Sequence, residues 1–209
     1  FFNQPVAAEA NYRMFWKSLR TLMEGQQDAQ DQLDQLLQDF PAAMQEAMQR
    51  MWSSKLGVPS ADDALVRDLL QLLVDSSADY SMVFRRLSDL PERFDALKDC
   101  FYLPLSTSLK SQWQDWLLRW RAQWPSGVDP ALISAGMRRV NPAITWREWL
   151  IAPAYQQAAE GDTSLMAELQ QLFSTPYEPP SPVLAARYDR LKPREFFSAG
   201  GVSHYSCSS

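Results

Sequence analysis

The residues of this chain best suited to chemistry are its two cysteines and its single histidine. Cys207 lies two residues before the last residue, Ser209, and His204 precedes it by three positions. A site near a chain end suits packing poorly, because free cysteine otherwise behaves as a small buried hydrophobe. We therefore predict that Cys207 is accessible and serves chemistry or redox control, and that Cys100 belongs to the core.

These residues do not make a self-contained active site. His204 could lower the pKa of the Cys207 thiol, but a terminal segment would not hold a base in fixed geometry for a nucleophile. One histidine and two distant cysteines lack metal-ligand spacing, and a thiol oxidoreductase would need a second cysteine close by. The seven glycines form neither G-x-G-x-x-G nor G-K-[ST]. We expect no catalytic, cofactor-binding or metal-binding residue within this chain.

Composition narrows the class of protein. With 209 residues, of which 46% are apolar, the chain can bury a core as one large domain or as a domain plus a tail. Its net charge of −5 argues against a nucleic-acid binder. We interpret the basic pairs Arg85-Arg86 and Arg138-Arg139 as solvated helix faces.

Cysteine usage and hydropathy bear on location. Two cysteines do not make a disulfide framework, so a reducing cytoplasm is the expected compartment. No run approaches the roughly 18 apolar residues of a membrane span, and no signal-peptide pattern opens the chain. Because the chain begins at Phe1 and not at methionine, we expect it to be part of a longer product.

The elements that must position these residues are helical, because apolar residues recur at three and four positions along most of the chain. The predicted class is all-α. The clearest stripe contains Trp113, Trp116, Trp120 and Trp124, which we interpret as core and not as a ligand-stacking surface.

Helix boundaries are predicted from caps and breakers. Gly25 is expected to end the first helix, and Pro41 to lie in the first turn of a later one. The predicted N-caps are the region of Asp62, then Asp79, Asp129 and Thr145. Residues 99–107 are the one stretch that could be extended.

The chain changes character after Thr175. Five prolines lie between residues 176 and 193, and glycines occupy positions 200 and 201. Such a composition favours a wrapped or mobile tail over a second core. The predicted organisation is a helical region over 1–175 and an irregular tail over 176–209.

Five short segments, in order, resemble the C-terminal part of the selenoprotein O family, the YdiU-type proteins of bacteria. They are Lys55-Leu56-Gly57-Val58; Ala78-Asp79-Tyr80-Ser81 with Phe84-Arg85-Arg86-Leu87-Ser88-Asp89; Trp116-Leu117-Leu118-Arg119-Trp120-Arg121; Asn141-Pro142 with Arg147, Trp149, Leu150 and Ala152; and the terminal Ser206-Cys207-Ser208-Ser209. The resemblance covers about residues 45–209. Glu148 and Trp149 stand where the family has Asn and Tyr, Pro153 interrupts a segment that is normally helical, and residues 192–196 replace a Pro-Pro-x-Trp piece.

The resemblance implies a protein-kinase-like fold and a protein adenylyltransferase, which transfers AMP from ATP to Ser, Thr or Tyr hydroxyls of proteins with Mg²⁺ or Mn²⁺. The family's catalytic groups lie in an N-terminal kinase-like part, the implied partner of this chain, and none maps onto a position here. Protein substrates are implied; nucleic acid and membrane are not. Cys207 corresponds to a family cysteine or selenocysteine that is thought to pair with an activation-segment cysteine as a redox switch.

A second hypothesis from another class stays open. A stand-alone helical scaffold would bind partner proteins through exposed parts of its Met- and Trp-rich faces. It predicts a chain that works alone, without enzymatic activity, whereas the first hypothesis predicts an exposed apolar patch where the missing lobe docks.

Overall fold

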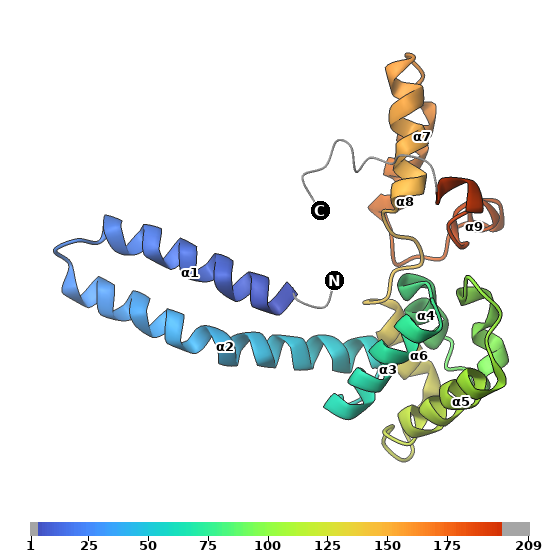
Figure 1. The fold of residues 1–209 in the computed structure, drawn as a ribbon, viewed down its shortest axis with the longest axis horizontal. Helices are drawn as coiled ribbons and strands as arrows, with labels where there is room; N and C mark the ends of the chain where they lie inside the picture. Colours follow the sequence, from blue (N-terminus) through green and yellow to red (C-terminus); the bar gives the residue numbers. More distant parts are fainter. Residues whose placement is uncertain (1–3, 198–209) are drawn as a thin grey trace. The chain divides into compact units, whose positions relative to one another are not determined.

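The computed structural model describes residues 4–197 and is built from helices (Figure 1). In chain order these are α1 (Gln4–Leu22), α2 (Gln27–Leu56), α3 (Asp63–Asp75), α4 (Tyr80–Leu87), the 3-10 helix η1 (Phe94–Cys100), α5 (Thr107–Arg121), α6 (Pro130–Arg138), α7 (Glu148–Ala159), α8 (Ser164–Ser174), α9 (Pro182–Tyr188) and the 3-10 helix η2 (Arg194–Phe196). Within 4–197 the extended structure is one isolated antiparallel bridge, between Ala78 and Phe101. The all-α prediction is confirmed.

The chain divides into two compact units, the first ending at Trp52 and the second beginning at Ser53. None of the helices in the described part of the chain is both long and apolar enough to cross a membrane.

The first unit is an antiparallel pair formed by α1 and most of α2, the blue helices of Figure 1. Asp34 of α2 accepts a hydrogen bond from the Trp16 indole at 3.0 Å and from the Arg20 guanidinium at 2.5 Å. The rings of Tyr12 and Phe40 stack with centroids 4.3 Å apart. These contacts hold the two helices side by side.

The predicted helix start at Pro41 is wrong. Helix α2 continues through Pro41, which lies in its interior. An interior proline removes one backbone hydrogen bond and crowds the preceding turn. Here Phe40 stacks on Tyr12 and Leu33 is buried, so tertiary contacts hold the residues before the proline in the helix.

The core of the second unit forms around α5. Trp113, Trp116 and Trp120 are fully buried, as their spacing predicted. Their polar atoms are satisfied by neighbouring helices: the Trp116 indole donates to the Leu65 carbonyl at 2.9 Å, and the Trp120 indole to the Leu56 carbonyl at 2.7 Å. The stripe is therefore a packing surface that also bonds α5 to α3 and to the end of α2.

Three predicted caps are confirmed. The Asp62, Asp79 and Asp129 carboxylates each accept a backbone N–H in the first turn of α3, α4 and α6 at 2.9 to 3.0 Å. Each thus satisfies a donor that lacks a partner within its own helix. The cap predicted at Thr145 is wrong, because α7 begins later and Thr145 donates instead to the Ser81 hydroxyl at 3.4 Å.

Two segments differ from the irregular structure that was expected of them. Residues 94–100 form the 3-10 helix η1, which includes the first positions of the stretch expected to be extended. In the predicted tail, Ser181 caps α9 and Pro182 occupies its first turn, a position that suits proline. Tyr188 is buried with Trp149 and Leu169 in a cluster contributed by α7, α8 and α9. Residues 182–197 therefore pack on the helical region.

Candidate functional site

The polar side chains of the segments that carry the family resemblance meet in the second unit. We call this set the polar cluster. It consists of the side chains of Asp79, Arg85, Arg86, Ser88, Asp89, Asn141 and Arg147, together with the backbone carbonyl of Lys55. The end of α2, helix α4 and the α6–α7 connection supply these residues, so the cluster joins positions far apart in the sequence.

Asp79 and Arg147 form the most buried ion pair among the residues that the structure describes. Their side chains are 8% and 14% exposed, and Arg147 Nη2 donates to Asp79 Oδ1 at 2.9 Å while Nη1 bonds Oδ2. The Tyr102 hydroxyl also donates to Asp79 Oδ2 at 3.3 Å. Asp79 also caps α4, because its carboxylate accepts the Met82 backbone N–H. Both carboxylate oxygens of Asp79 therefore accept hydrogen bonds from other groups of the protein.

Arg85 was predicted to lie on a solvated face, and this prediction is wrong. The residue is 8% exposed, and Nη1 donates to the backbone carbonyls of Arg138, Asn141 and Tyr177 at 3.4, 3.0 and 3.2 Å. Burial lowers the pKa of Arg85, and the nearby Arg138 lowers it further. Its role is to satisfy carbonyls of the α6–α7 connection and of the segment before α9.

Asn141 is fully buried and bonds two other segments. Its side-chain nitrogen donates to the Lys55 carbonyl at 2.8 Å and to the Ser88 hydroxyl at 3.2 Å. The end of α2 and the end of α4 are thus held to the residue that precedes Pro142. An asparagine suits the position because its amide group carries two N–H donors, one for each of these acceptors, whereas its buried Oδ1 has no hydrogen-bond partner among the described residues.

Arg86 and Arg138 each pair with an acid. Arg86 Nη2 lies 3.0 Å from Asp189 Oδ2, and Arg138 Nη2 lies 2.6 Å from Asp89 Oδ1. Burial acts to lower the pKa of Arg86, but Asp189 more than offsets this, and the pKa is raised on balance. The sequence shows that Arg85 and Arg86 are adjacent positive charges, but it does not show which acid pairs with Arg86. That acid, Asp189, lies 103 positions away.

The arrangement suits structure better than reaction chemistry. The arginines, the aspartates and the Asn141 amide nitrogen of the cluster bond one another, backbone groups, or the neighbouring Asp189 and Arg138 side chains. No nucleophile lies beside a base within the cluster. Across residues 4–197, no group of three or more His, Cys, Asp or Glu side chains could hold a metal ion.

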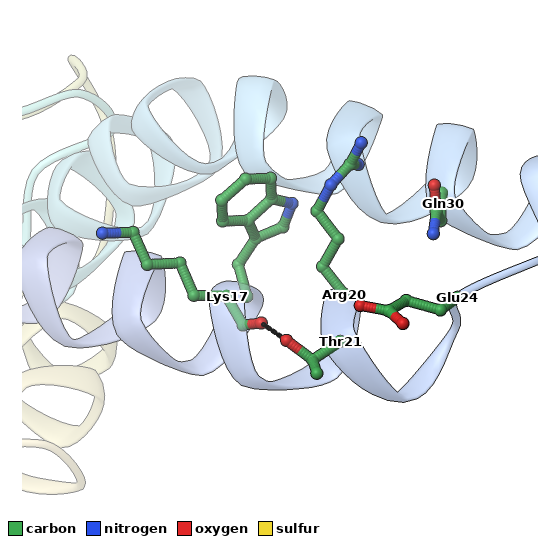
Figure 2. A pocket seen from close by; sticks show the side chains of 6 residues that line it. Lys17, Arg20, Thr21, Glu24 and Gln30 are labelled. Atoms are coloured by element: carbon green, nitrogen blue, oxygen red, sulfur yellow. Dashed lines mark hydrogen bonds between the residues drawn. The ribbon is translucent and has the colours of Figure 1, made fainter.

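Two open hollows lie away from the polar cluster. One, of about 440 Å³, is lined by Trp16, Lys17, Arg20, Thr21, Glu24 and Gln30. Figure 2 shows Arg20 pointing toward α2 and the Thr21 hydroxyl bonded to the Lys17 carbonyl of its own helix. The hydroxyl therefore serves its own backbone, and mixed charges line the hollow.

The second hollow, of about 780 Å³, lies along the length of α5 and includes Arg93, Lys110 and Arg121. Arg121 is already committed to the Leu90 carbonyl at 2.6 Å and to Glu92 at 3.2 Å. Acidic Glu92 and Asp95 line it too, so neither charge sign dominates.

Of the two cysteines, only Cys100 lies within the described residues. It is fully buried, as predicted for a core residue, and burial raises the pKa of its thiol to about 12. A thiol with so high a pKa is a poor nucleophile at neutral pH. Cys207, the predicted redox residue, and His204 lie outside the described residues.

Comparison with known proteins bears on the whole chain. The family model described as "Protein adenylyltransferase SelO" matches residues 1–174. The protein nucleotidyltransferase YdiU of Rhizobium etli is 30% identical over 201 residues, which are 93% of this chain and 39% of that protein. The YdiU protein of Salmonella enteritidis is 28% identical over 183 residues, which are 85% of this chain and 36% of that protein. The chain thus spans less than half the length of these relatives. The family model covers most of its residues, and the chain belongs to the SelO family.

Proposed function

We propose that this chain is the helical, non-catalytic C-terminal part of a bacterial protein adenylyltransferase. The complete protein would transfer AMP from ATP to Ser, Thr or Tyr hydroxyls of proteins. The observation that carries the proposal is the match of the SelO family model to residues 1–174. The polar cluster supports a buttress role, because its side chains bond three parts of the fold to one another.

In this proposal ATP and Mg²⁺ or Mn²⁺ are bound by a kinase-like part outside these residues. That part is also the proposed partner of the first unit. Helix α1 has no buried residue, and Met14, Phe15 and Leu22 are exposed on it. A further layer of protein would remove these side chains from water, which favours docking.

Cys207 is the proposed regulatory residue, acting in the cytoplasm as a redox switch. Its thiolate would attack a disulfide such as oxidised glutathione and release one glutathione thiolate. The thiolate of a cysteine in the kinase-like part would then attack the mixed disulfide and release the second. The result is an intramolecular S–S bond that a reducing thiol pool reverses.

The test is AMP transfer by the 209-residue chain alone and by the longer protein. We expect the longer protein, with ATP and Mg²⁺, to add AMP to a protein hydroxyl, seen as a mass increase of the substrate. The chain alone should consume no ATP; transfer by it would contradict the assignment. For the switch, non-reducing mass spectrometry of the longer protein should find Cys207 linked to another cysteine, and a thiol that stays free under oxidised glutathione would refute this part.

The exposed apolar side chains of α1 also suit the scaffold hypothesis. A scaffold predicts that the isolated chain binds another protein through α1 and that no kinase-like part accompanies it. The two hypotheses are distinguished by adding the kinase-like part as a separate polypeptide to the 209-residue chain. If the chain binds that polypeptide and Phe15→Asp abolishes the binding, the result favours the buttress role over the scaffold.

A further inference from the structure

Lys55, in the last turn of α2, differs from an ordinary surface lysine in what surrounds its amine. We propose that Lys55 is an acylation site, whose amine takes an acyl group from an activated donor, either an acyl phosphate or an acyl thioester. All residues that form this site belong to the second unit, and its chemistry is independent of the proposed function.

Two aromatic rings of α4 flank the Lys55 amine. Tyr80 and Phe84 lie four positions apart on one face of the helix, with their ring centroids 4.6 Å from each other. Lys55 Nζ lies 4.6 Å from the centre of the Phe84 ring and 5.6 Å from the centre of the Tyr80 ring. Phe84 is buried and Tyr80 is 40% exposed, so the site has one wall in the core and one wall at the surface.

The surroundings of the amine favour its neutral form. Lys55 has no carboxylate partner among the described residues, since the nearby acid in sequence order on α4, Asp79, is held by Arg147, and burial lowers the pKa of Lys55. Tyr80 brings no negative charge, because burial raises the pKa of its hydroxyl to about 12. Ring faces attract an ammonium, but more weakly than the water that they displace hydrates it. A larger share of this amine is therefore neutral than in the unfolded chain.

The amine is nevertheless open to solvent. Within residues 4–197, the sealed side-chain nitrogen and oxygen atoms that lack a hydrogen-bond partner belong to Gln123, Trp124, Asn141 and Trp149. Lys55 Nζ has no such partner either and is not one of these atoms, so water reaches it. The Asn141 amide holds the Lys55 backbone carbonyl at 2.8 Å, which fixes the turn that carries the amine. A half-buried lysine with an open approach is suited to act as a nucleophile.

The reaction is the transfer of an acyl group to nitrogen. The neutral amine attacks the acyl carbon with its lone pair and forms the N–C bond of an amide. The C–O bond to phosphate, or the C–S bond of a thioester, breaks, and the leaving group keeps the electron pair. The proton lost from nitrogen goes to water, and nothing is oxidised or reduced. The amide that results is uncharged, so it suits a half-buried position that has no counter-ion.

The site is tested by giving the 209-residue protein acetyl phosphate in one arm and an acetyl thioester in the other. Mass spectrometry of chymotryptic peptides measures an acetylation rate for each lysine, and the exposed Lys98 and Lys110 serve as references. A lower pKa raises the neutral fraction of an amine more than it reduces its nucleophilicity, so relative to these references we expect Lys55 to react at least about threefold faster in the native protein than in guanidinium chloride. The arm with the larger ratio identifies the donor, and a smaller ratio with both donors would overturn the site.

The role of the rings is tested with Tyr80→Ser, which removes the surface wall and leaves Phe84 in the core. Tyr155→Ser is the matched control, because Tyr155 of α7 is 52% exposed and is not one of the two rings that flank Lys55. We expect the native-to-unfolded ratio of Lys55 to fall toward one in Tyr80→Ser and to stay unchanged in Tyr155→Ser. Thermal unfolding checks that both variants are folded. A ratio that is unchanged in Tyr80→Ser, or that falls equally in the two variants, would overturn the assignment of the reactivity to this site.

Discussion

At the scale of single residues, Asp79 carries more contacts than any neighbouring acid of the polar cluster. It caps α4, accepts two nitrogens of Arg147 and accepts the Tyr102 hydroxyl. A buried carboxylate is tolerated only when charge and hydrogen bonds compensate the loss of water. Arg147 supplies the compensating charge, so loss of either partner leaves the other buried and uncompensated.

We predict that Arg147→Met lowers the free energy of unfolding by about 3 kcal/mol, because it leaves the Asp79 charge buried without a counter-ion. Urea unfolding followed by tryptophan fluorescence measures this. Asp79→Asn combined with Arg147→Met should cost less than the sum of the single changes. The control is Arg119→Met, whose pair with Asp68 is exposed and should cost less than about 1 kcal/mol. Equal losses in the two arginine variants would contradict the compensation.

A second residue-scale prediction concerns Cys100 and pH. Burial raises the pKa of its thiol from 9.0 to about 12, so between these values the unfolded chain releases a proton that the native protein keeps. The stabilisation is complete below about pH 9 and is lost as pH rises toward 12, by at most about 1.4 kcal/mol per pH unit. Urea unfolding at pH 8.5 and 10.5 should show the decline, and Cys100→Ala should reduce its slope. An identical slope in the variant would refute the assignment.

Residue roles were predictable from sequence where the partner is local. The caps at Asp62, Asp79 and Asp129 bond backbone groups two or three positions away, so their sequence signal was sufficient. Arg85 was misjudged because its three acceptors lie 53 to 92 positions away. Local charge pattern does not reveal carbonyls that the fold delivers from another segment.

At the scale of elements, the junction after α2 depends on Gly57. This residue has a φ of +63°, and a Cβ atom placed on it would lie 2.7 Å from Ile133 Cγ2 and from Met137 Sδ. The junction therefore requires glycine at this position for two reasons. The backbone has a positive φ, and α6 lies too close to leave room for a Cβ atom.

We predict that Gly57→Ala costs about 3 kcal/mol, from left-handed backbone strain together with overpacking against α6. Gly127→Ala is the matched control, since Gly127 has a φ of +78° but nothing within 4 Å of the added Cβ. It should cost only about 1 kcal/mol. Thermal unfolding of both variants measures the difference, and equal shifts in melting temperature would show that the contact with α6 is unimportant.

Element types followed from periodicity, while several boundaries did not. The tryptophan stripe is read directly from residues three and four apart. Trp113, Trp116 and Trp120 are buried as expected, whereas Trp124 lies beyond the end of α5 and is only half-buried. Proline gave the wrong boundary at Pro41 and concealed a helix at Pro182, because the same residue can start, interrupt or remain within a helix. Which outcome holds is decided by tertiary contacts such as Phe40 on Tyr12 and the burial of Tyr188.

At the scale of the whole molecule, the two units differ in what they bury. Within residues 4–52, Leu33 is the one apolar side chain that is buried, whereas the second unit encloses three tryptophans of α5. A pair of helices without a third layer leaves most of its apolar surface in water, and packing is the main source of helix stability in proteins. The first unit should therefore open far more easily than the second.

We predict that amides of α1 exchange at least about a hundredfold faster than amides of α5 in the isolated chain, because opening the first unit exposes little that was buried. Hydrogen–deuterium exchange on peptides from both helices measures the ratio. Leu22, 77% exposed, already lies in water, and Leu22→Ser should leave exchange in α5 unchanged. Under the proposed function, the kinase-like part of the longer protein would cover α1 and slow its exchange by a comparable factor, and Leu22→Ser would then weaken that protection. Protection of α1 in the isolated chain equal to that of α5 would mean that the first unit is stable by itself, and the case for a docked partner would lose its physical basis.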